Sequence, residues 1–295
     1  MSGEPMTDIS ATLVKTLREK TGAGVMACRT TLAETGGNLD AAIERLRDAQ
    51  TTMAAKKADR VTTEGLVGLA MAGGRGALVE LNCETDFVAR SDAFRQAASG
   101  LARVALEVDG DVEALRSAAS PDGDGHVSDL VTRLMARTGE RVSVRRCAYL
   151  SVTEGQLVPY VHNAVAPGVG SIGTLVALET RAPAAVVAGL GRSVAMHIAA
   201  SAPRWVSSDD IPAEVTSEKR AELLAQARTS GKPDGVVEKM VEGRLRKFVD
   251  EVALRRQPFI MDPDRTVAEA VEEAGRAAGE TITVRAFARF KVGER

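Results

Sequence analysis

A ten-residue segment holds the side chains best suited to recognising another molecule. It reads Asn82-Cys-Glu-Thr-Asp-Phe-Val-Ala-Arg-Ser91, follows the strand-like run Gly76–Leu81 and precedes a helical pattern that starts near Asp92. It therefore sets an acid, Asp86, beside an aromatic, Phe87, in a chain with only six Phe, two Tyr and one Trp. Such a pair can fill the local core and cap the helix, or it can insert into a partner. The residue types alone leave both interpretations open.

The glycine-rich segment Gly168-Val-Gly-Ser-Ile-Gly173 matches the Gly-x-Gly-x-x-Gly pattern of dinucleotide-binding loops. That pattern binds phosphates only when it follows a strand and opens a helix. Here Pro167 precedes the glycines and the strand-like run Gly173–Leu178 follows them. The context favours a hairpin turn, and the sequence has no Gly-x-x-x-x-Gly-Lys-Ser/Thr loop either. We therefore expect no direct nucleotide binding and no cofactor.

Histidine and cysteine are too scattered for a recognisable metal or nucleophile site. The three histidines are His126, His162 and His197, and the three cysteines are Cys28, Cys83 and Cys147. None forms a ligand pair such as His-Glu-x-x-His or Cys-x-x-Cys, and no Gly-x-Ser-x-Gly elbow is present. The sequence therefore predicts no metal and no enzymatic activity. Odd, separated cysteines fit a reducing cytoplasm.

The length and net charge of the chain indicate which class of protein it is and which kinds of partner it could bind. A chain of 295 residues with 44% hydrophobic and 26% charged residues is ordinary for a soluble protein of about two domains. The net charge of −2 makes nucleic acid an unlikely partner, because phosphate binding normally needs a basic excess. An RNA- or ribosome-binding module is thus the weaker rival to a protein-binding factor. The polar, acidic N-terminus predicts no signal peptide, and no apolar run approaches the ~20 residues that span a bilayer.

The first residues predict a three-helix bundle over residues 6–55. Apolar residues recur at helical spacing from Ile9 to Leu17, and Thr21–Gly24 interrupts the pattern. Asn38 is placed to cap a third helix. The run Ala54-Ala-Lys-Lys-Ala-Asp-Arg60 is rich in alanine and charge and predicts a connector, which is expected at residues 56–62.

The remainder contains an internal repeat. Gly76-Ala-Leu-Val-Glu-Leu81 resembles Gly173-Thr-Leu-Val-Ala-Leu178, and Val142-Ser-Val-Arg-Arg-Cys-Ala148 resembles Ile282-Thr-Val-Arg-Ala-Phe-Ala288. The segments alternate as strands do, so each copy is expected to be a strand–strand–helix–strand unit. The copies are expected at residues 63–149 and 150–290, with 291–295 as a tail.

The second copy has the longer span between its two matching segments, so it must carry an insertion. Two long helical patterns lie at about residues 212–256, and the second has an apolar stripe that includes Val237, Val241 and Leu245. An antiparallel helical hairpin is the simplest interpretation. In the first copy, Asp109–Asp129 is expected to be a surface loop.

Five segments in the same order resemble the bacterial elongation factor Ts family. They are Thr21–Cys28, the segment with Thr85-Asp-Phe-Val88, Val194–Ser201, Lys232–Arg244 with Gln257-Pro-Phe259, and Phe287–Glu294. Together they cover nearly the whole chain. The resemblance implies an α+β fold, with an N-terminal three-helix bundle like ubiquitin-associated domains and two related antiparallel-sheet-plus-helix subdomains.

The resemblance also implies a function: guanine-nucleotide exchange on the GTPase elongation factor Tu during translation. In that family Thr85, Asp86, Phe87 and Val88 would reach beside the nucleotide's Mg2+ site and displace the ion. Some family members continue beyond the last motif into a further helical module. This sequence ends at Arg295, so contacts made by that module are expected to be absent or replaced.

Further partner contacts are implied at Arg18, Val25, Met26 and His197. From the residues alone, Val25 and Met26 would be core, and His197 would be a hydrogen-bonded histidine at the core edge. Position 25 is valine where the family commonly has methionine, and the shorter, stiffer side chain adapts less readily to a partner.

Overall fold

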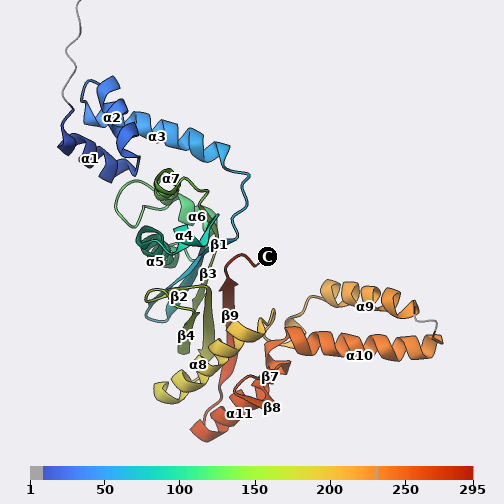
Figure 1. Ribbon diagram of the computed structural model, residues 1–295. Coiled ribbons are helices and arrows are strands. Elements are labelled where there is room, and N and C mark those ends of the chain that lie inside the picture. Colours follow the sequence, from blue (N-terminus) through green and yellow to red (C-terminus); the bar gives the residue numbers. More distant parts are fainter. Residues whose placement is uncertain (1–8, 230–231, 295) are drawn as a thin grey trace, which may run out of the picture.

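The computed structural model describes residues 9–229 and 232–294 and has an elongated shape (Figure 1). A helical bundle lies at one end, two sheets with their helices form the body, and a helical hairpin projects from the side. The mixed α+β class predicted from the sequence is confirmed. Residues 6–8 of the expected bundle and Arg295 of the expected tail lie outside the described residues.

The N-terminal bundle has a small core of its own. Its helices are α1 (Ala11–Thr21), α2 (Val25–Glu34) and α3 (Leu39–Lys56). Leu17, Cys28 and Leu32 are fully buried between them. Asn38 caps α3 as predicted, because its side-chain oxygen accepts a hydrogen bond from the Ala41 N–H at 3.1 Å.

The first sheet-containing part is a four-stranded antiparallel sheet in the order β3-β2-β1-β5. Its strands are β1 (Glu64–Ala72), β2 (Arg75–Cys83), β3 (Ser143–Ser151) and β5 (Val169–Gly170). Its helices are α4 (Asp86–Ala89), α5 (Asp92–Glu107), α6 (Val112–Ser117) and α7 (Val127–Thr138).

The second part is a three-stranded antiparallel sheet in the order β4-β6-β9. It contains β4 (Gly155–His162), β6 (Ile172–Glu179), α8 (Ala184–Ser201), α11 (Val267–Ala278) and β9 (Thr283–Lys291). The smaller elements are η1 (Ser208–Asp210), η2 (Leu254–Arg256), β7 (Pro258–Phe259) and β8 (Asp262–Thr266).

The two parts repeat one unit, as the sequence predicted. β1-β2-α5-β3 and β4-β6-α8-β9 have the same order and pairing. Each has a β-bulge at the same place, between Glu80 and Leu81 in one copy and between Ala177 and Leu178 in the other. The sheets face each other across an apolar layer that includes Leu78, Leu175 and Phe290. Helices α5 and α8 cover their outer faces.

The projecting hairpin consists of α9 (Ala213–Arg228) and α10 (Asp234–Val252) (Figure 1). Leu223, Val237 and Val241 are buried where the two helices meet. The apolar stripe predicted on the second helix therefore packs against its own neighbour.

The surface loop expected in the first copy needs correction. Residues 109–129 are not a plain loop, because they contain helix α6. Asp111 caps this helix, and Leu115 on it is fully buried in the core beside β3. In the described part of the chain, one helix, α8, is long and apolar enough to span a membrane by length and composition. Its buried residues, such as Val194 and Ile198, pack in the core of the second sheet, which explains its hydropathy.

A buried carboxylate, Glu80, connects the first sheet to the end of the chain. The bulge brings Arg145 and Arg146 to the same carboxylate, at 3.1 and 2.6 Å. Glu80 also accepts hydrogen bonds from the Asn82 side chain and from the Gly293 N–H, at 3.1 and 3.0 Å. Because it is fully buried, the carboxylate depends on these donors.

We expect Glu80→Gln to lower the free energy of unfolding by about 2–4 kcal/mol, because it removes the charge that two arginines share inside the protein. The matched control is Glu113→Gln, whose carboxylate is 76% exposed beside Arg116 and should contribute little. Urea unfolding followed by circular dichroism measures both. Equal midpoints for Glu80→Gln and wild type would contradict a structural role for this carboxylate.

Candidate functional site

Phe87 lies just beyond the most buried strand of the first sheet. Strand β2 is buried from Gly76 to Cys83, and its side chains contact the helix-covered face and the layer between the sheets. Four residues later the Phe87 side chain is 83% exposed. The interpretation of Phe87 as a plug of the local core is therefore wrong. The buried strand is instead followed by the one-turn helix α4, whose Phe87 ring faces solvent.

The neighbours of Phe87 are better anchored. Val88 packs against the first core, and Ala89 is buried in it. Asp86 forms an ion pair with Arg90 across one helical turn, at 2.9 Å. Asp86 does not cap α5; Ser91 does so, by accepting a hydrogen bond from the Phe94 N–H at 3.4 Å.

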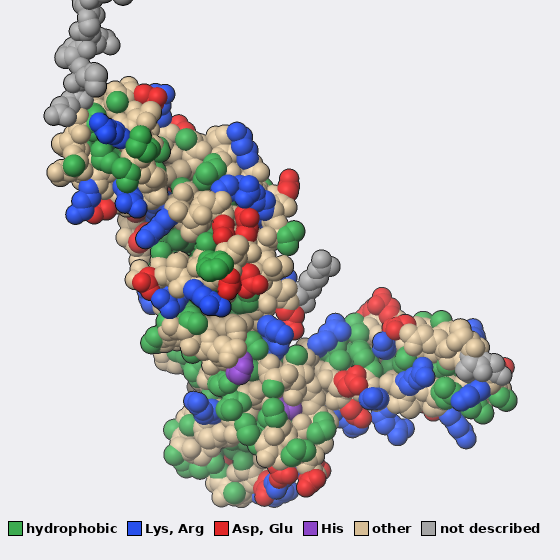
Figure 2. All heavy atoms as spheres, in the orientation of Figure 1, with side chains coloured by type: hydrophobic (Ala, Val, Ile, Leu, Met, Phe, Trp, Pro, Cys, Tyr) green, Lys and Arg blue, Asp and Glu red, His purple; other side chains and the backbone are tan. Residues whose placement is uncertain are grey.

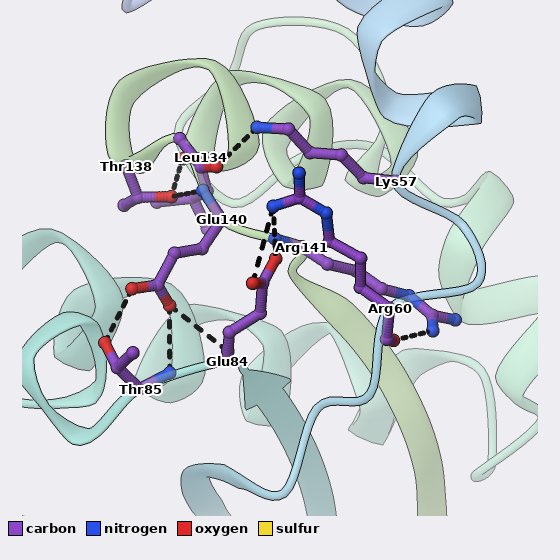
Figure 3. Close-up of polar contacts among 9 residues, drawn as sticks. Lys57, Arg60, Glu84, Thr85, Leu134, Thr138, Glu140 and Arg141 are labelled. Atoms are coloured by element: carbon purple, nitrogen blue, oxygen red, sulfur yellow. Dashed lines mark hydrogen bonds and ion pairs between the residues drawn. The ribbon is translucent and has the colours of Figure 1, made fainter.

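Thr85 is held by a residue that sequence reasoning missed. Glu140 accepts hydrogen bonds from the Glu84 N–H, the Thr85 N–H and the Thr85 hydroxyl, at 3.1, 3.0 and 2.6 Å (Figure 3). Glu84 in turn accepts the Arg141 N–H at 2.6 Å. That hydrogen bond, with the guanidinium of Arg60, holds the pKa of Glu84 below its usual value. No local pattern in the sequence links residues this far apart.

The site does not have the chemistry of a nucleophile or a metal centre. Burial, helped by the nearby charges of Glu140 and Glu64, raises the pKa of the Cys83 thiol to about 12, which keeps it protonated. Across residues 9–229 and 232–294, no group of three His, Cys, Asp or Glu side chains is placed to hold a metal ion. The glycine-rich segment forms β5 and leads directly into β6, so it opens no helix.

The bundle residues implied as partner contacts are exposed. Val25 and Met26, at the start of α2, are 49% and 71% exposed, and Arg18 on α1 is also exposed. The expectation from residue type alone, that Val25 and Met26 are core, is wrong. They lie on the bundle, whereas Thr85–Val88 extend from the first sheet, so the structure places the candidate residues in two separate groups.

His197 does not lie on the surface. Its imidazole is fully buried on α8, between Gln257 and the loop after β7. The ring Nδ1 accepts a hydrogen bond from the Ile260 N–H at 3.2 Å, so Nε2 carries the proton and donates to Gln257 at 2.8 Å. Burial lowers the pKa of His197, against the opposing effect of Gln257. The expected direct contact with a partner is corrected to a structural position that fixes the backbone of Ile260.

Charges of both signs are interspersed over the face shown in Figure 2, and apolar side chains lie among them. The exposed large apolar residues include Phe87, Met26, Ile260 and Met261. Exposed aromatic and methionine side chains are typical of protein-binding surfaces.

Comparisons with known proteins identify the family of the chain. Residues 84–294 match the family model described as elongation factor TS. The chain is 49% identical over 290 residues to the elongation factor Ts of Rhodospirillum rubrum, covering 98% of this chain and 94% of that protein. It is 50% identical over 292 residues to the elongation factor Ts of Hyphomonas neptunium, covering 98% and 93%.

The family match includes the Thr85–Val88 segment, and the likeness to the relatives also covers the bundle. Identity near one half extends over nearly the full length of both chains. The chain belongs to the elongation factor Ts family.

Proposed function

We propose that the protein is a guanine-nucleotide exchange factor for elongation factor Tu. It binds the GDP-loaded GTPase, displaces Mg2+ and GDP, and allows reloading with GTP during translation elongation. It is a protein-binding factor without a substrate pocket or cofactor of its own, and it acts in the cytoplasm. The observation that carries the proposal is the exposed Phe87 ring on α4, just beyond the buried strand β2.

The exposed ring supports insertion for an energetic reason. A Phe side chain in water has not gained the roughly 1.5–3 kcal/mol that burial provides. Phe87 gains that free energy only when a partner opens to receive it, so its binding favours an opened form of the GTPase. Val88 and Ala89, which follow Phe87 in the chain, pack in the first core and so anchor the backbone that carries the ring.

Asp86 adds an electrostatic effect. Its side chain is half-exposed on α4 and, among the described residues, forms an ion pair with the exposed Arg90. A negative charge brought near phosphates weakens nucleotide binding. Backbone displaced by the ring can no longer hold Mg2+, which requires nearly ideal octahedral geometry.

Thermodynamic linkage between factor binding and nucleotide binding would convert these contacts into nucleotide exchange. If the factor binds the nucleotide-free GTPase more tightly than the loaded form, nucleotide binds the complex more weakly by the same factor. Each ~1.4 kcal/mol of this antagonism changes nucleotide affinity tenfold.

The bundle provides the second contact. Arg18, Val25 and Met26 present a cation and two apolar side chains that suit a docking surface. We further propose that His197 contributes indirectly, by fixing the backbone of Ile260 next to exposed Met261. The proposed units are the bundle (6–55), the connector (56–62), two core subdomains (63–149 and 150–290, with the hairpin at about 212–256) and the tail (291–295).

Phe87→Ala should slow GDP release from elongation factor Tu about tenfold or more, on the scale of ~1.4 kcal/mol per decade of rate. The mutant should unfold at the wild-type temperature, because the ring makes little contact with its own core. Stopped-flow release of a fluorescent GDP analogue, with and without excess Mg2+, is the measurement. Val61→Ala, at a 77% exposed apolar residue of the connector, is the matched control and should exchange normally.

The protein alone should not bind GDP or GTP at micromolar concentrations, because the only glycine fingerprint in the sequence forms a strand turn. Equilibrium dialysis with radiolabelled GDP measures this directly. Micromolar binding by the isolated chain would contradict a mechanism that acts only through the partner.

Deleting residues 1–55 should weaken binding to the GTPase, because it removes Arg18, Val25 and Met26. The remainder should stay folded with a lower unfolding temperature, because the described residues of the deleted segment contribute the apolar contacts of Met53 and Ala54 and the ion pair of Arg47 with Asp124. Calorimetric titration and thermal unfolding give the two quantities, and full-length Met26→Ala is the point-mutant control. An insoluble or molten truncation would place the boundary elsewhere.

A further inference from the structure

Two glutamates, Glu84 and Glu140, form reciprocal hydrogen bonds next to residues 85–88, here called the Phe87 segment. Glu84, the residue after β2, accepts a hydrogen bond from the backbone N–H of Arg141. Glu140, beyond α7, reaches back to the N–H groups of Glu84 and Thr85 and to the Thr85 hydroxyl (Figure 3). Each segment therefore supplies the acceptor that the other segment's backbone needs.

The Phe87 segment needs such an external support. Helix α4 is a single turn of four residues, too short to be stable by itself. Thr85 occupies its N-cap position, but the Thr85 side chain makes no capping bond to the helix and donates to Glu140 instead. The core holds the other end of the turn through Val88 and Ala89. Glu140 thus fixes the side of the turn that the core does not reach.

Glu140 is itself firmly placed. Helix α7 ends at Thr138, and the residue that caps it, Gly139, has a φ of 75°, a left-handed conformation that favours glycine. The Glu140 N–H donates to the Thr138 hydroxyl at 3.3 Å, and Lys57 donates to the Gly139 carbonyl (Figure 3). The carboxylate therefore projects from a well-defined helix end.

The connector joins the same network. Arg60 pairs with Glu84 at 3.2 Å, and the Arg141 side chain donates to the Arg60 carbonyl. Glu84 is therefore held by Arg60 of the connector and by the Arg141 N–H. The backbone that leads into Phe87 donates its hydrogen bonds to Glu140 instead.

We propose that Glu140 is a positioning residue for Phe87: it fixes the backbone at Thr85 so that the exposed ring meets the partner in one orientation. The inference rests on the proposed insertion of Phe87 into the GTPase. A ring that is already oriented requires less ordering when it inserts, which favours the step that opens the nucleotide site.

The test measures release of a fluorescent GDP analogue from elongation factor Tu over a range of concentrations of the full-length factor. Glu140→Ala should lower the maximal release rate about tenfold, while the half-saturating concentration changes by less than about threefold, because the bundle contacts are untouched. Glu140→Gln keeps one acceptor oxygen and should recover part of the rate. Glu107→Ala, at an exposed carboxylate on α5, is the control and should match wild type.

A double-mutant cycle separates positioning from general stability. In the Phe87→Ala background, Glu140→Ala should have no further effect on the maximal rate, because there is no ring left to orient. The same fold-loss in both backgrounds would overturn the inference, since it would mean that Glu140 acts independently of Phe87. If Glu140→Ala does not fold, Thr85→Val, which removes the hydroxyl donor to Glu140, enters the same cycle under the same criteria.

Failure of this inference differs from failure of the proposed function. A slow Phe87→Ala protein together with wild-type rates for Glu140→Ala would overturn positioning alone. Wild-type rates for Phe87→Ala would overturn the insertion step, and the role of Glu140 with it.

Discussion

Strand β2 is buried on both faces, and this constraint determines how the rest of the molecule is built. Its alternate side chains face the helix-covered core and the layer between the sheets. Glu80 on the inner face is fully buried and holds two arginines and the backbone near the chain end. Because β2 cannot shift without exposing these groups, the segment that follows it starts from a fixed point.

The two repeat copies show how an exposed aromatic side chain arises on a common framework. Both have the same strand order and the same bulge, but Glu80 in the first copy corresponds to Ala177 in the second. The first copy continues into Thr85–Val88 and a single-turn helix, whereas the second continues into the long core helix α8. Equivalent scaffolds therefore serve different purposes: one presents an exposed ring, and the other buries His197 and carries the projecting hairpin.

Rigid support and exposed apolar groups occur together in this protein. Phe87 follows a buried strand, and Ile260 is fixed by a buried histidine. The conformational entropy of these segments is therefore lost during folding, so that less is lost when a partner binds. Such preorganisation supports the proposed role in nucleotide exchange.

The sequence by itself determined the α+β class, the repeat, the helical hairpin and the Asn38 cap, because these depend on local periodicity and on short-range hydrogen bonds. It also singled out Phe87, but residue type could not say whether the ring was buried. Only the tertiary structure decided that Phe87 is exposed, that His197 is buried, and that Glu140 reaches Thr85. Burial and long-range hydrogen bonds depend on which distant segments meet, and a linear pattern of residue types does not contain that information.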